Sequence, residues 1–259
     1  MRYYQIAVRG GESHLAVEAT EDMVVDLTAL SPHVRSFFDL MQTASIMGTT
    51  IDRVARQVLD RGTSSTFSVR DMHENTENAS GWPRMQVPLR SPEVWATGVT
   101  YQDSMKERQA ESGTPDVYAR VYAADRPEVF FKATPSRLMG PYDEVGIRAD
   151  STWDVPEPEL GFVLYDGEIV GYLCGNDMSS RSIEGENPLY LPQAKVYDRS
   201  CSIGPCIATR ETVGDPQDLT VRLAIERGGK QAFQGETSTS LMVKDCEYIA
   251  DWLQRHNPV

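Results

Sequence analysis

Residues 156–181 read PEPELGFVLYDGEIVGYLCGNDMSSR. Two apolar runs, at residues 160–165 and 168–174, flank the dipeptide Asp166-Gly167, which is among the strongest short signals for a β-hairpin turn. We therefore predict two antiparallel strands in this stretch. Because a hairpin reverses the chain, the end of the second strand returns beside the start of the first.

Three carboxylates fall at the open end of this expected hairpin. Glu157 and Glu159 are two residues apart, so in a strand their side chains point to the same side. Asp177 follows the second apolar run and is expected to return next to them. Like charges held this close repel, so either the pair faces water or a cation lies between the carboxylates. An E-x-E pair alone is typical of a solvated strand end, whereas three carboxylates predict an oxygen-rich site for Mg²⁺, with Mn²⁺ or Ca²⁺ as alternatives.

Charge and composition disfavour several classes of partner. The 259 residues carry a formal net charge of −13, whereas a nucleic-acid-binding protein normally presents a basic face. No stretch approaches the roughly 18 apolar residues of a membrane span, and the start, MRYYQIAVRGG, lacks the apolar segment of a signal peptide. The four cysteines form no C-x-x-C pair, which indicates reduced thiols. We expect a cytoplasmic protein that binds a small molecule, with no nucleic-acid or membrane partner.

The chain is predicted to have two parts. Short strands are expected in the first part at residues 3–9, 13–18 and 23–28. Residues 61–81 are polar and poor in large apolar side chains, so we expect a loop or linker there. Beyond Trp82, short apolar runs alternate with Gly, Pro and Asp turns and predict a β-rich portion. The expected division is a small α+β domain with its linker at residues 1–81 and a catalytic domain at residues 82–259.

Helical periodicity predicts three amphipathic helices. Ser31-Pro32 is typical of an N-cap and a first turn, and the helix near residues 32–46 is expected to turn toward the core Val34, Phe37, Phe38, Met41 and Ile46. A second helix near residues 51–60 is expected to bury Ile51, Val54 and Val58. The last, near residues 240–255, is expected to bury Leu241, Cys246, Ile249 and Leu253.

Three motifs in order resemble the fumarylacetoacetate hydrolase superfamily. They are the E-x-E pair, GNDMSSR at residues 175–181, and QAKVYDRSCSIGP at residues 193–205. The family pattern is E-x-E, then (N)D-x-S-x-R, then a lysine and a Gly-Pro turn. The match covers residues 82–259, and its residues are Glu157, Glu159, Asp177, Arg181, Gln193 and Lys195. The resemblance implies an α+β fold with a mixed β-roll around Mg²⁺, a homodimer or higher homo-oligomer, and 2-oxo acid substrates that chelate the metal.

The stretch at residues 98–107, GVTYQDSMKE, departs from the family's lid motif, G-x-N-Y-x-x-H-x-x-E. Gly98, Tyr101 and Glu107 fit the motif, but Ser104 occupies the histidine position. A hydroxyl does not accept a proton near neutral pH as imidazole does, so this departure weakens C–C bond hydrolysis as the function.

Other segments resemble one branch of the superfamily. RPEVFFKAT (126–134), ADSTWDVPEPEL (149–160) and EGENPLYLPQAKVYD (184–198) resemble dehydratases that convert 2-keto-3-deoxy-pentonates to 2,5-dioxopentanoate. Two alternatives remain. One is an acylpyruvate-type C–C hydrolase or a 2-hydroxyhepta-2,4-diene-1,7-dioate isomerase, and the other is an inactive member that acts as a binding or assembly subunit.

The resemblance implies roles for the remaining polar residues. A cation on the 2-oxo oxygen stabilises an enolate and makes the C3 protons acidic. Lys195 is the first candidate for the base, because burial and a nearby cation lower a lysine pKa, and its alternative role is to neutralise the carboxylates. Glu107 or Glu128 is the candidate acid for the C4 hydroxyl, or else a solvated surface residue. The expected substrate-binding residues are Tyr101, Ser104, Lys132, Arg181 and Gln193. For Lys132 and Arg181, the alternative role is to pair with a carboxylate.

The sequence ends at DWLQRHNPV, directly after the last expected helix. Members of the superfamily normally continue with an L-x-T-G-T-like strand whose threonine contacts substrate. We therefore expect a catalytic portion without those strands and with an open edge of the roll.

Overall fold

The structure is a computed structural model that describes residues 1–101, 109 and 115–257. Its largest element is a nine-stranded sheet. The strands run in the order β10 (Pro158–Tyr165), β11 (Glu168–Asp177), β13 (Cys201–Thr209), β1 (Arg2–Ala7), β2 (Ser13–Thr20), β3 (Met23–Asp26) and β4 (Thr66–Ser68), with β5 (Arg84–Met85) on β1 and β8 (Leu138–Met139) on β13. Because β1 pairs with β13, one sheet crosses residue 81, and the division into two domains there stays a prediction.

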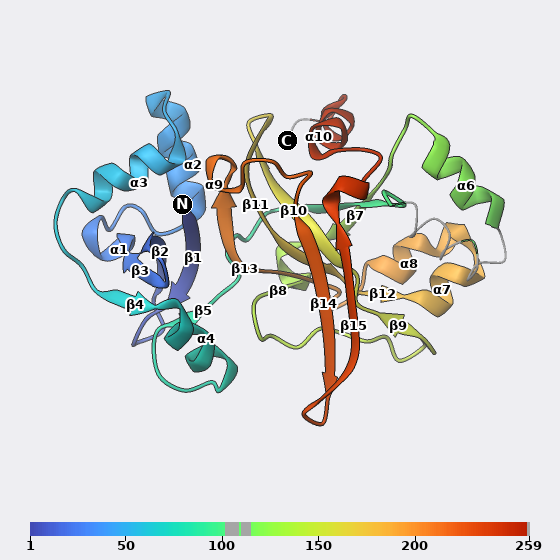
Figure 1. The fold of residues 1–259 in the computed structure, drawn as a ribbon, viewed down its shortest axis with the longest axis horizontal. Helices are drawn as coiled ribbons and strands as arrows, with labels where there is room; N and C mark the ends of the chain where they lie inside the picture. The colour runs from blue at the N-terminus through green and yellow to red at the C-terminus, as the bar shows by residue number, and fades with distance from the viewer. Residues whose placement is uncertain (102–108, 110–114, 258–259) are drawn as a thin grey trace.

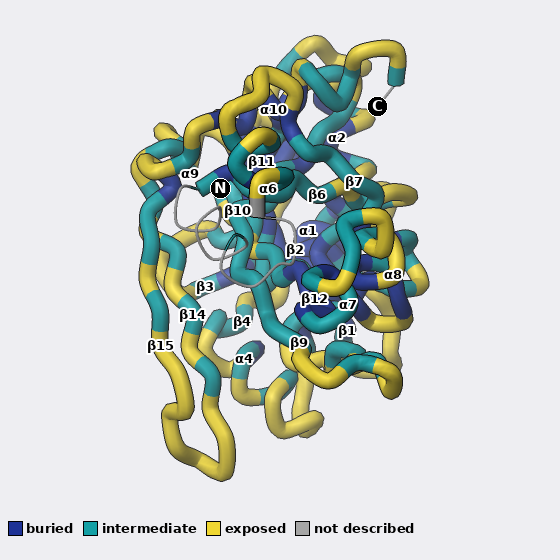
Figure 2. Tube along the Cα trace, turned by 90° about the vertical axis from the view of Figure 1, so that its right-hand side faces the viewer, coloured by how far each residue is buried: buried dark blue, intermediate teal, exposed yellow. Residues whose placement is uncertain are grey.

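Three two-stranded sheets accompany the large one. They are β6 (Val94–Gly98) with β7 (Glu128–Ala133), β9 (Asp154–Val155) with β12 (Ser179–Ser180), and β14 (Thr220–Arg227) with β15 (Lys230–Ser238). Figure 1 shows the β14–β15 hairpin as a long arm that extends from the body of the molecule, and Figure 2 shows that its far end is exposed.

The helices lie mainly on two sides of the strands (Figure 1). They are α1 (Leu27–Leu30), α2 (Phe37–Met47), α3 (Ile51–Leu59), α4 (Val69–Glu77), α6 (Pro115–Ala123), α7 (Arg181–Glu186), α8 (Leu191–Lys195), α9 (Arg210–Val213) and α10 (Cys246–Gln254), with 3₁₀ turns at Pro135–Arg137, Pro188–Tyr190 and Thr239–Leu241. α1 to α3 lie on the N-terminal side, and α6 to α8 lie on the opposite side. Within the described residues, no helix combines the length and the apolar character needed to cross a membrane.

The hairpin predicted from residues 156–181 is confirmed. β10 and β11 pair antiparallel, with Tyr165 opposite Glu168 at the turn. Asp166 and Gly167 both have positive φ, at 50° and 81°, a backbone region that glycine and, less readily, aspartate adopt. At the open end, the backbone N–H of Asp177 donates to the carbonyl of Glu157 at 2.9 Å. The hairpin therefore places these two acidic residues side by side.

The N-terminal strands and α3 also match the prediction. Ile51, Val54 and Val58 are buried on one face of α3. α2 and α3 pack in one cluster with side chains from β1 and β2, and the rings of Tyr3 and Phe37 lie 5.3 Å apart at its centre. This packing holds β1 against the rest of the sheet.

The predicted start of the first long helix is wrong. α2 begins after Ser36, which forms a capping box with Asp39, while Ser31 ends the short helix α1. The core face shifts accordingly: Phe38 is 44% exposed and Ile46 is 87% exposed, so neither belongs to it. The residues of α2 that are buried are Phe37, Leu40, Met41 and Ala44. The reciprocal side-chain bonds of the capping box fix the start more strongly than a serine before proline does.

Two further predictions of local structure are wrong. Residues 61–81 contain β4 and α4, although they were expected to form a loop. α4 buries only Met72, and β4 is held by backbone pairing to β3, so neither leaves a clear apolar period in the sequence. The last helix begins at Cys246 because Asp245 caps it, which leaves Leu241 outside the helix and 55% exposed; Cys246 and Ile249 are buried as predicted.

We expect Phe37→Ala to lower the free energy of unfolding by about 3–5 kcal/mol, because it removes a fully buried ring from the core. Urea unfolding followed by circular dichroism measures this change. The matched control is Phe38→Ala on the same helix, whose cost is expected to be about 1 kcal/mol or less, since that ring is partly exposed and meets only the edge of Tyr165. Equal losses would contradict the assignment of the core face.

Candidate active site

The acidic end of the β10–β11 hairpin is joined by a lysine from α8. The ammonium of Lys195 donates a hydrogen bond to Oε2 of Glu157 and another to Oδ2 of Asp177, the latter at 3.0 Å. Lys195 is 5% exposed and Asp177 is 7% exposed, so the charges meet away from bulk water. The structure therefore brings together three residues that the sequence singled out, although they come from three different segments.

Sequence reasoning missed Ser179, which completes this contact. Ser179 is fully buried, its hydroxyl donates to Oε2 of Glu157 at 2.7 Å, and it accepts from the Lys195 ammonium at 2.6 Å. The signal was present, since Ser179 is the serine of the D-x-S-x-R motif, two residues after Asp177. A single hydroxyl thus fixes the position of the lysine relative to the glutamate.

Arg181 orients the other oxygen of Glu157. Its guanidinium donates to Oε1 of Glu157 at 2.6 Å and also pairs with Glu184, which sequence reasoning did not single out. Both Arg181 and Glu184 are buried on α7, which Ser180 caps. The carboxylate-pairing alternative for Arg181 is the arrangement that the structure has.

Lys132 reaches the site from β7 and is 1% exposed. Its ammonium lies 2.5 Å from Oδ1 of Asp177, and it donates to the backbone carbonyls of Met178, at 2.8 Å, and of Lys195. Burial lowers the pKa of Lys132, and the neighbouring Asp177 carboxylate opposes that shift. With three protein oxygens around it, Lys132 acts as a buried ion-pair partner, which is one of its two predicted roles.

Glu159 stands apart from this network. In the described part of the chain its carboxylate has no hydrogen-bond or ion-pair partner. Burial raises the pKa of Glu159 well above its usual range, and the Glu157 and Asp177 charges raise it further. Tyr101 lies close enough to sense that carboxylate: burial, followed by the Glu159 charge, raises the pKa of Tyr101 to about 12. Glu159 and Tyr101 are therefore neighbours in the site.

The donor set has the chemistry of a hard-cation site. All candidate ligands are carboxylate oxygens, which suit Mg²⁺, Mn²⁺ or Ca²⁺. Among the described residues, no three Asp, Glu, His or Cys side chains are gathered at metal-binding distances, and the Lys195 ammonium bonds to both Glu157 and Asp177. The carboxylate of Glu159, which has no cationic partner in these ranges, fits a divalent cation as its counter-charge.

Opposing effects act on the pKa of Lys195. Burial lowers it, as the sequence-based argument expected, but the Glu157 and Asp177 carboxylates outweigh burial and the net shift is upward. The prediction of a lowered pKa also invoked a nearby cation, and it stays a prediction for the site with its metal bound.

Glu128 begins β7 and faces the same region. Burial raises its pKa, and the Glu184 and Glu157 charges add to the shift while Lys195 opposes it. A Cβ atom on Gly98 would lie 2.4 Å from Oε2 of Glu128, so the glycine at the end of β6 leaves the space that this carboxyl group occupies. A carboxyl group with a raised pKa holds its proton more readily and suits a general acid.

Gln193 is not brought to the carboxylates. Gln193 is exposed on α8 and lies two positions before Lys195, so its side chain points to nearly the opposite side of the helix. Its backbone carbonyl accepts a bond from Arg148 at 3.3 Å. Ser104 and Glu107 lie outside the described residues.

Comparisons with known proteins identify the family of this chain. The family model for the C-terminal part of fumarylacetoacetate (FAA) hydrolase matches residues 93–259. The chain therefore belongs to the fumarylacetoacetate hydrolase superfamily, and the expected α+β fold of that family is confirmed.

Its relatives include dehydratases of sugar acids. A probable 2-keto-3-deoxyxylonate dehydratase from Haloferax volcanii is 50% identical over 259 residues, which cover 100% of this chain and 85% of the relative. A 2-dehydro-3-deoxy-D-arabinonate dehydratase from Saccharolobus solfataricus is 41% identical over 182 residues, or 68% of this chain and 61% of the relative. A solved 2-keto-3-deoxy-D-arabinonate dehydratase, complexed with magnesium and 2,5-dioxopentanoate, has a TM-score of 0.80 and 28% identity and covers 100% of this chain and 84% of its own.

We expect Lys132→Met to lower the free energy of unfolding by about 3–5 kcal/mol, because it removes one of the two lysines that neutralise the buried Asp177 carboxylate and leaves two backbone carbonyl oxygens without their donor. Thermal and urea unfolding measure the loss. Lys230→Met, at the exposed start of β15, is the control and is expected to change stability by about 0.5 kcal/mol or less. A neutral effect of Lys132→Met would show that the ammonium is not needed to hold Asp177.

Proposed function

We propose that this enzyme is a Mg²⁺-dependent hydro-lyase that dehydrates a 2-keto-3-deoxy-pentonate to 2,5-dioxopentanoate. The observation that carries the proposal is the acidic end of the β10–β11 hairpin, where the backbone pairs Asp177 with Glu157 and the buried Glu159 senses the charges of both. The named activities of the Haloferax and Saccharolobus relatives support the same reaction. The magnesium and 2,5-dioxopentanoate in the related solved structure support the cofactor and the product.

Glu157, Glu159 and Asp177 are the proposed metal ligands. Bound there, Mg²⁺ supplies a Lewis acid that polarises the 2-oxo group of the substrate and makes its C3 protons acidic. Arg181 and Ser179 hold the Glu157 carboxylate in place from two sides. These hydrogen bonds keep the Glu157 carboxylate oriented as a metal ligand, which is what hydrogen-bonded partners around a metal site usually do.

Lys195 is the proposed base at C3. Its raised pKa depends on the charges of Glu157 and Asp177. If Glu157 and Asp177 held Mg²⁺, their negative charge would be partly neutralised and the pKa of Lys195 would be lower than in the metal-free site, so that the neutral amine could take the C3 proton. Ser179 accepts a bond from the same nitrogen and keeps it near the carboxylates.

Glu128 is the proposed acid that protonates the departing C4 hydroxyl. Its burial raises its pKa, and it lies close enough to sense the Lys195 charge, so an acid and a base occur in one site. Glu107 is the alternative acid. Tyr101, beside Glu159, is the proposed contact for the substrate, together with Ser104 and Gln193.

We also propose a homodimer or higher homo-oligomer in the cytoplasm. An isolated two-stranded hairpin is marginally stable in water. β14 contacts β10, but the far end of the β14–β15 arm is exposed, and this exposed end suits contact with a second copy. All four cysteines are free thiols, in keeping with a reducing compartment.

The function is tested by incubating the purified protein with Mg²⁺ and either 2-keto-3-deoxy-pentonates or acylpyruvates. We expect 2,5-dioxopentanoate from the former, measured by coupling the aldehyde to an NAD-dependent dehydrogenase, and no cleavage of the latter. Chelation with EDTA is expected to abolish turnover, and added Mg²⁺ to restore it. Turnover of acylpyruvates alone would contradict the dehydratase assignment and favour the hydrolase.

The matched variants for this assay are Glu159→Gln and Glu144→Gln. Glu159→Gln removes a proposed ligand, so we expect Mg²⁺ affinity by calorimetry to fall by about tenfold or more and turnover to fall with it. Glu144 is 91% exposed, and its replacement is expected to leave both quantities unchanged. Unchanged Mg²⁺ affinity in Glu159→Gln would remove this residue from the ligand set.

Glu128→Gln is expected to lower kcat by about 100-fold to 10,000-fold while Mg²⁺ affinity stays the same, because an amide fills the space but does not deliver a proton. Steady-state kinetics with the pentonate and calorimetry with Mg²⁺ separate the two effects. If kcat stays near the wild-type value, Glu107 becomes the leading candidate for the acid.

A further inference from the structure

A second cavity lies far from the carboxylates, in the N-terminal part of the molecule. Its volume is about 530 Å³, within the range typical of small-molecule sites. It is lined by Val8, Arg9, His14, Asp26, Ser65, Phe67, Gly81, Trp82 and Pro83. Its walls come from the turn between β1 and β2, from β2, β3 and the start of β4, and from residues 81–83 before β5. β10 lies at the opposite end of the sheet, so this cavity is separate from the proposed active site.

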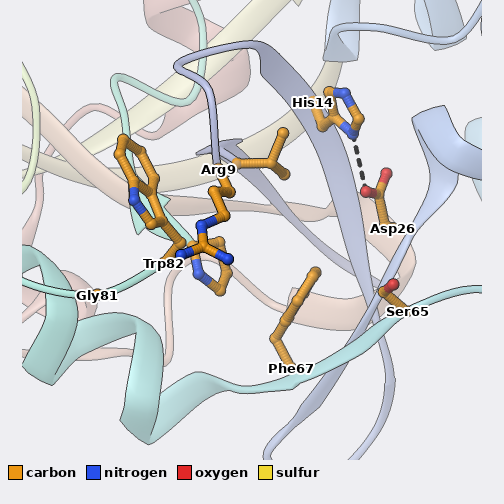
Figure 3. A pocket seen from close by; sticks show the side chains of 9 residues that line it. Arg9, His14, Asp26, Ser65, Phe67, Gly81 and Trp82 are labelled. Carbon is orange, nitrogen blue, oxygen red and sulfur yellow. Dashed lines mark hydrogen bonds and ion pairs between the residues drawn. The ribbon is translucent and has the colours of Figure 1, made fainter.

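One wall of the cavity is a fixed His–Asp pair. Nδ1 of His14 lies 2.8 Å from Oδ2 of Asp26, and Oδ1 of Asp26 accepts a bond from the backbone of Ala29 at 2.9 Å (Figure 3). Nε2 of His14 lies 3.6 Å from the exposed carboxylate of Glu12. Within the described residues, the Ser65 hydroxyl makes no hydrogen bond to His14, so these side chains do not form a nucleophilic triad.

Arg9 supplies the positive charge of the cavity. In the view of Figure 3 it lies between Trp82 and the His14–Asp26 pair. Arg9 is an exposed residue, and throughout the described ranges its side chain has no hydrogen bond or ion pair, although the chain carries a net charge of −13 and is rich in carboxylates. A guanidinium that lines a cavity and has no protein partner is suited to a ligand carboxylate.

The other wall is apolar and partly aromatic. Trp82 is 41% exposed, and the guanidinium of Arg84 lies 4.7 Å from its ring centre. Phe67 and Pro83 complete this wall. Such flat surfaces favour a planar apolar group over a polyol chain.

A singly charged ligand fits better than a dianion, because Glu12 and Asp26 both place negative charge near His14.

We propose that this cavity binds a small aromatic monocarboxylate, with the carboxylate on Arg9 and the ring against Trp82 and Phe67. The site is a second ligand site, separate from the carboxylate cluster, and the proposal does not rest on the proposed dehydratase activity.

Naphthalene-2-carboxylate is the probe, and isothermal titration calorimetry in EDTA measures its binding, so that no metal can hold a carboxylate at the hairpin. We expect saturable binding of one probe per chain. Its neutral analogue, naphthalene-2-methanol, is expected to bind about tenfold or more weakly, because it makes no charged pair with Arg9. Arg9→Ala and Trp82→Ala are expected to lower the affinity of the protein for the probe by a similar factor.

Two controls locate the binding. Arg70→Ala removes an arginine of α4 whose side chain is 83% exposed and lies outside the cavity, and it is expected to leave probe affinity unchanged. Glu159→Gln, at the hairpin, is likewise expected to have no effect. Near-ultraviolet circular dichroism shows that each variant keeps its fold. Absence of probe binding, equal affinity for the neutral analogue, or full affinity in Arg9→Ala would each overturn the proposal.

Discussion

The site depends on how the negative charges at the end of the β10–β11 hairpin are neutralised. Glu157 and Asp177 are forced together by backbone pairing, and two buried carboxylates without counter-charges are strongly unfavourable. Lys195, Lys132 and Arg181 supply those charges from α8, β7 and α7. These three elements must therefore lie against the hairpin, and the C-terminal part of the fold is arranged around that requirement.

The same electrostatics separates the acidic residues into two kinds. Glu157 and Asp177 are held by cationic partners, whereas burial raises the pKa values of Glu159 and Glu128, which have no such partner in the described ranges. An acid of the first kind is held in a fixed position. An acid of the second kind is available to a metal ion or to a proton, which is the division of labour that an enolate-forming lyase needs.

Local sequence patterns failed where tertiary contacts decide the outcome. The stretch at residues 61–81 lacks a visible apolar period, yet it forms β4 and α4 because β3 offers backbone partners and Met72 fills one gap in a core. The start of α2 was misplaced since two serines compete for it and the capping box at Ser36 is the stronger. Ser179 was overlooked although it stands in the D-x-S-x-R motif, because its side-chain partners Glu157 and Lys195 come from other segments.

The sequence by itself determined the hairpin through Asp166-Gly167, the acidic residues at its open end and membership in the superfamily, since each depends on neighbouring residues or on motif order. Only the tertiary structure decided which cations meet those acids and how the pKa of Lys195 shifts, because these depend on distances between residues far apart in the chain. The cavity around Arg9 likewise exists only once β2, β3 and β4 are assembled, as no sequence pattern encodes an empty space.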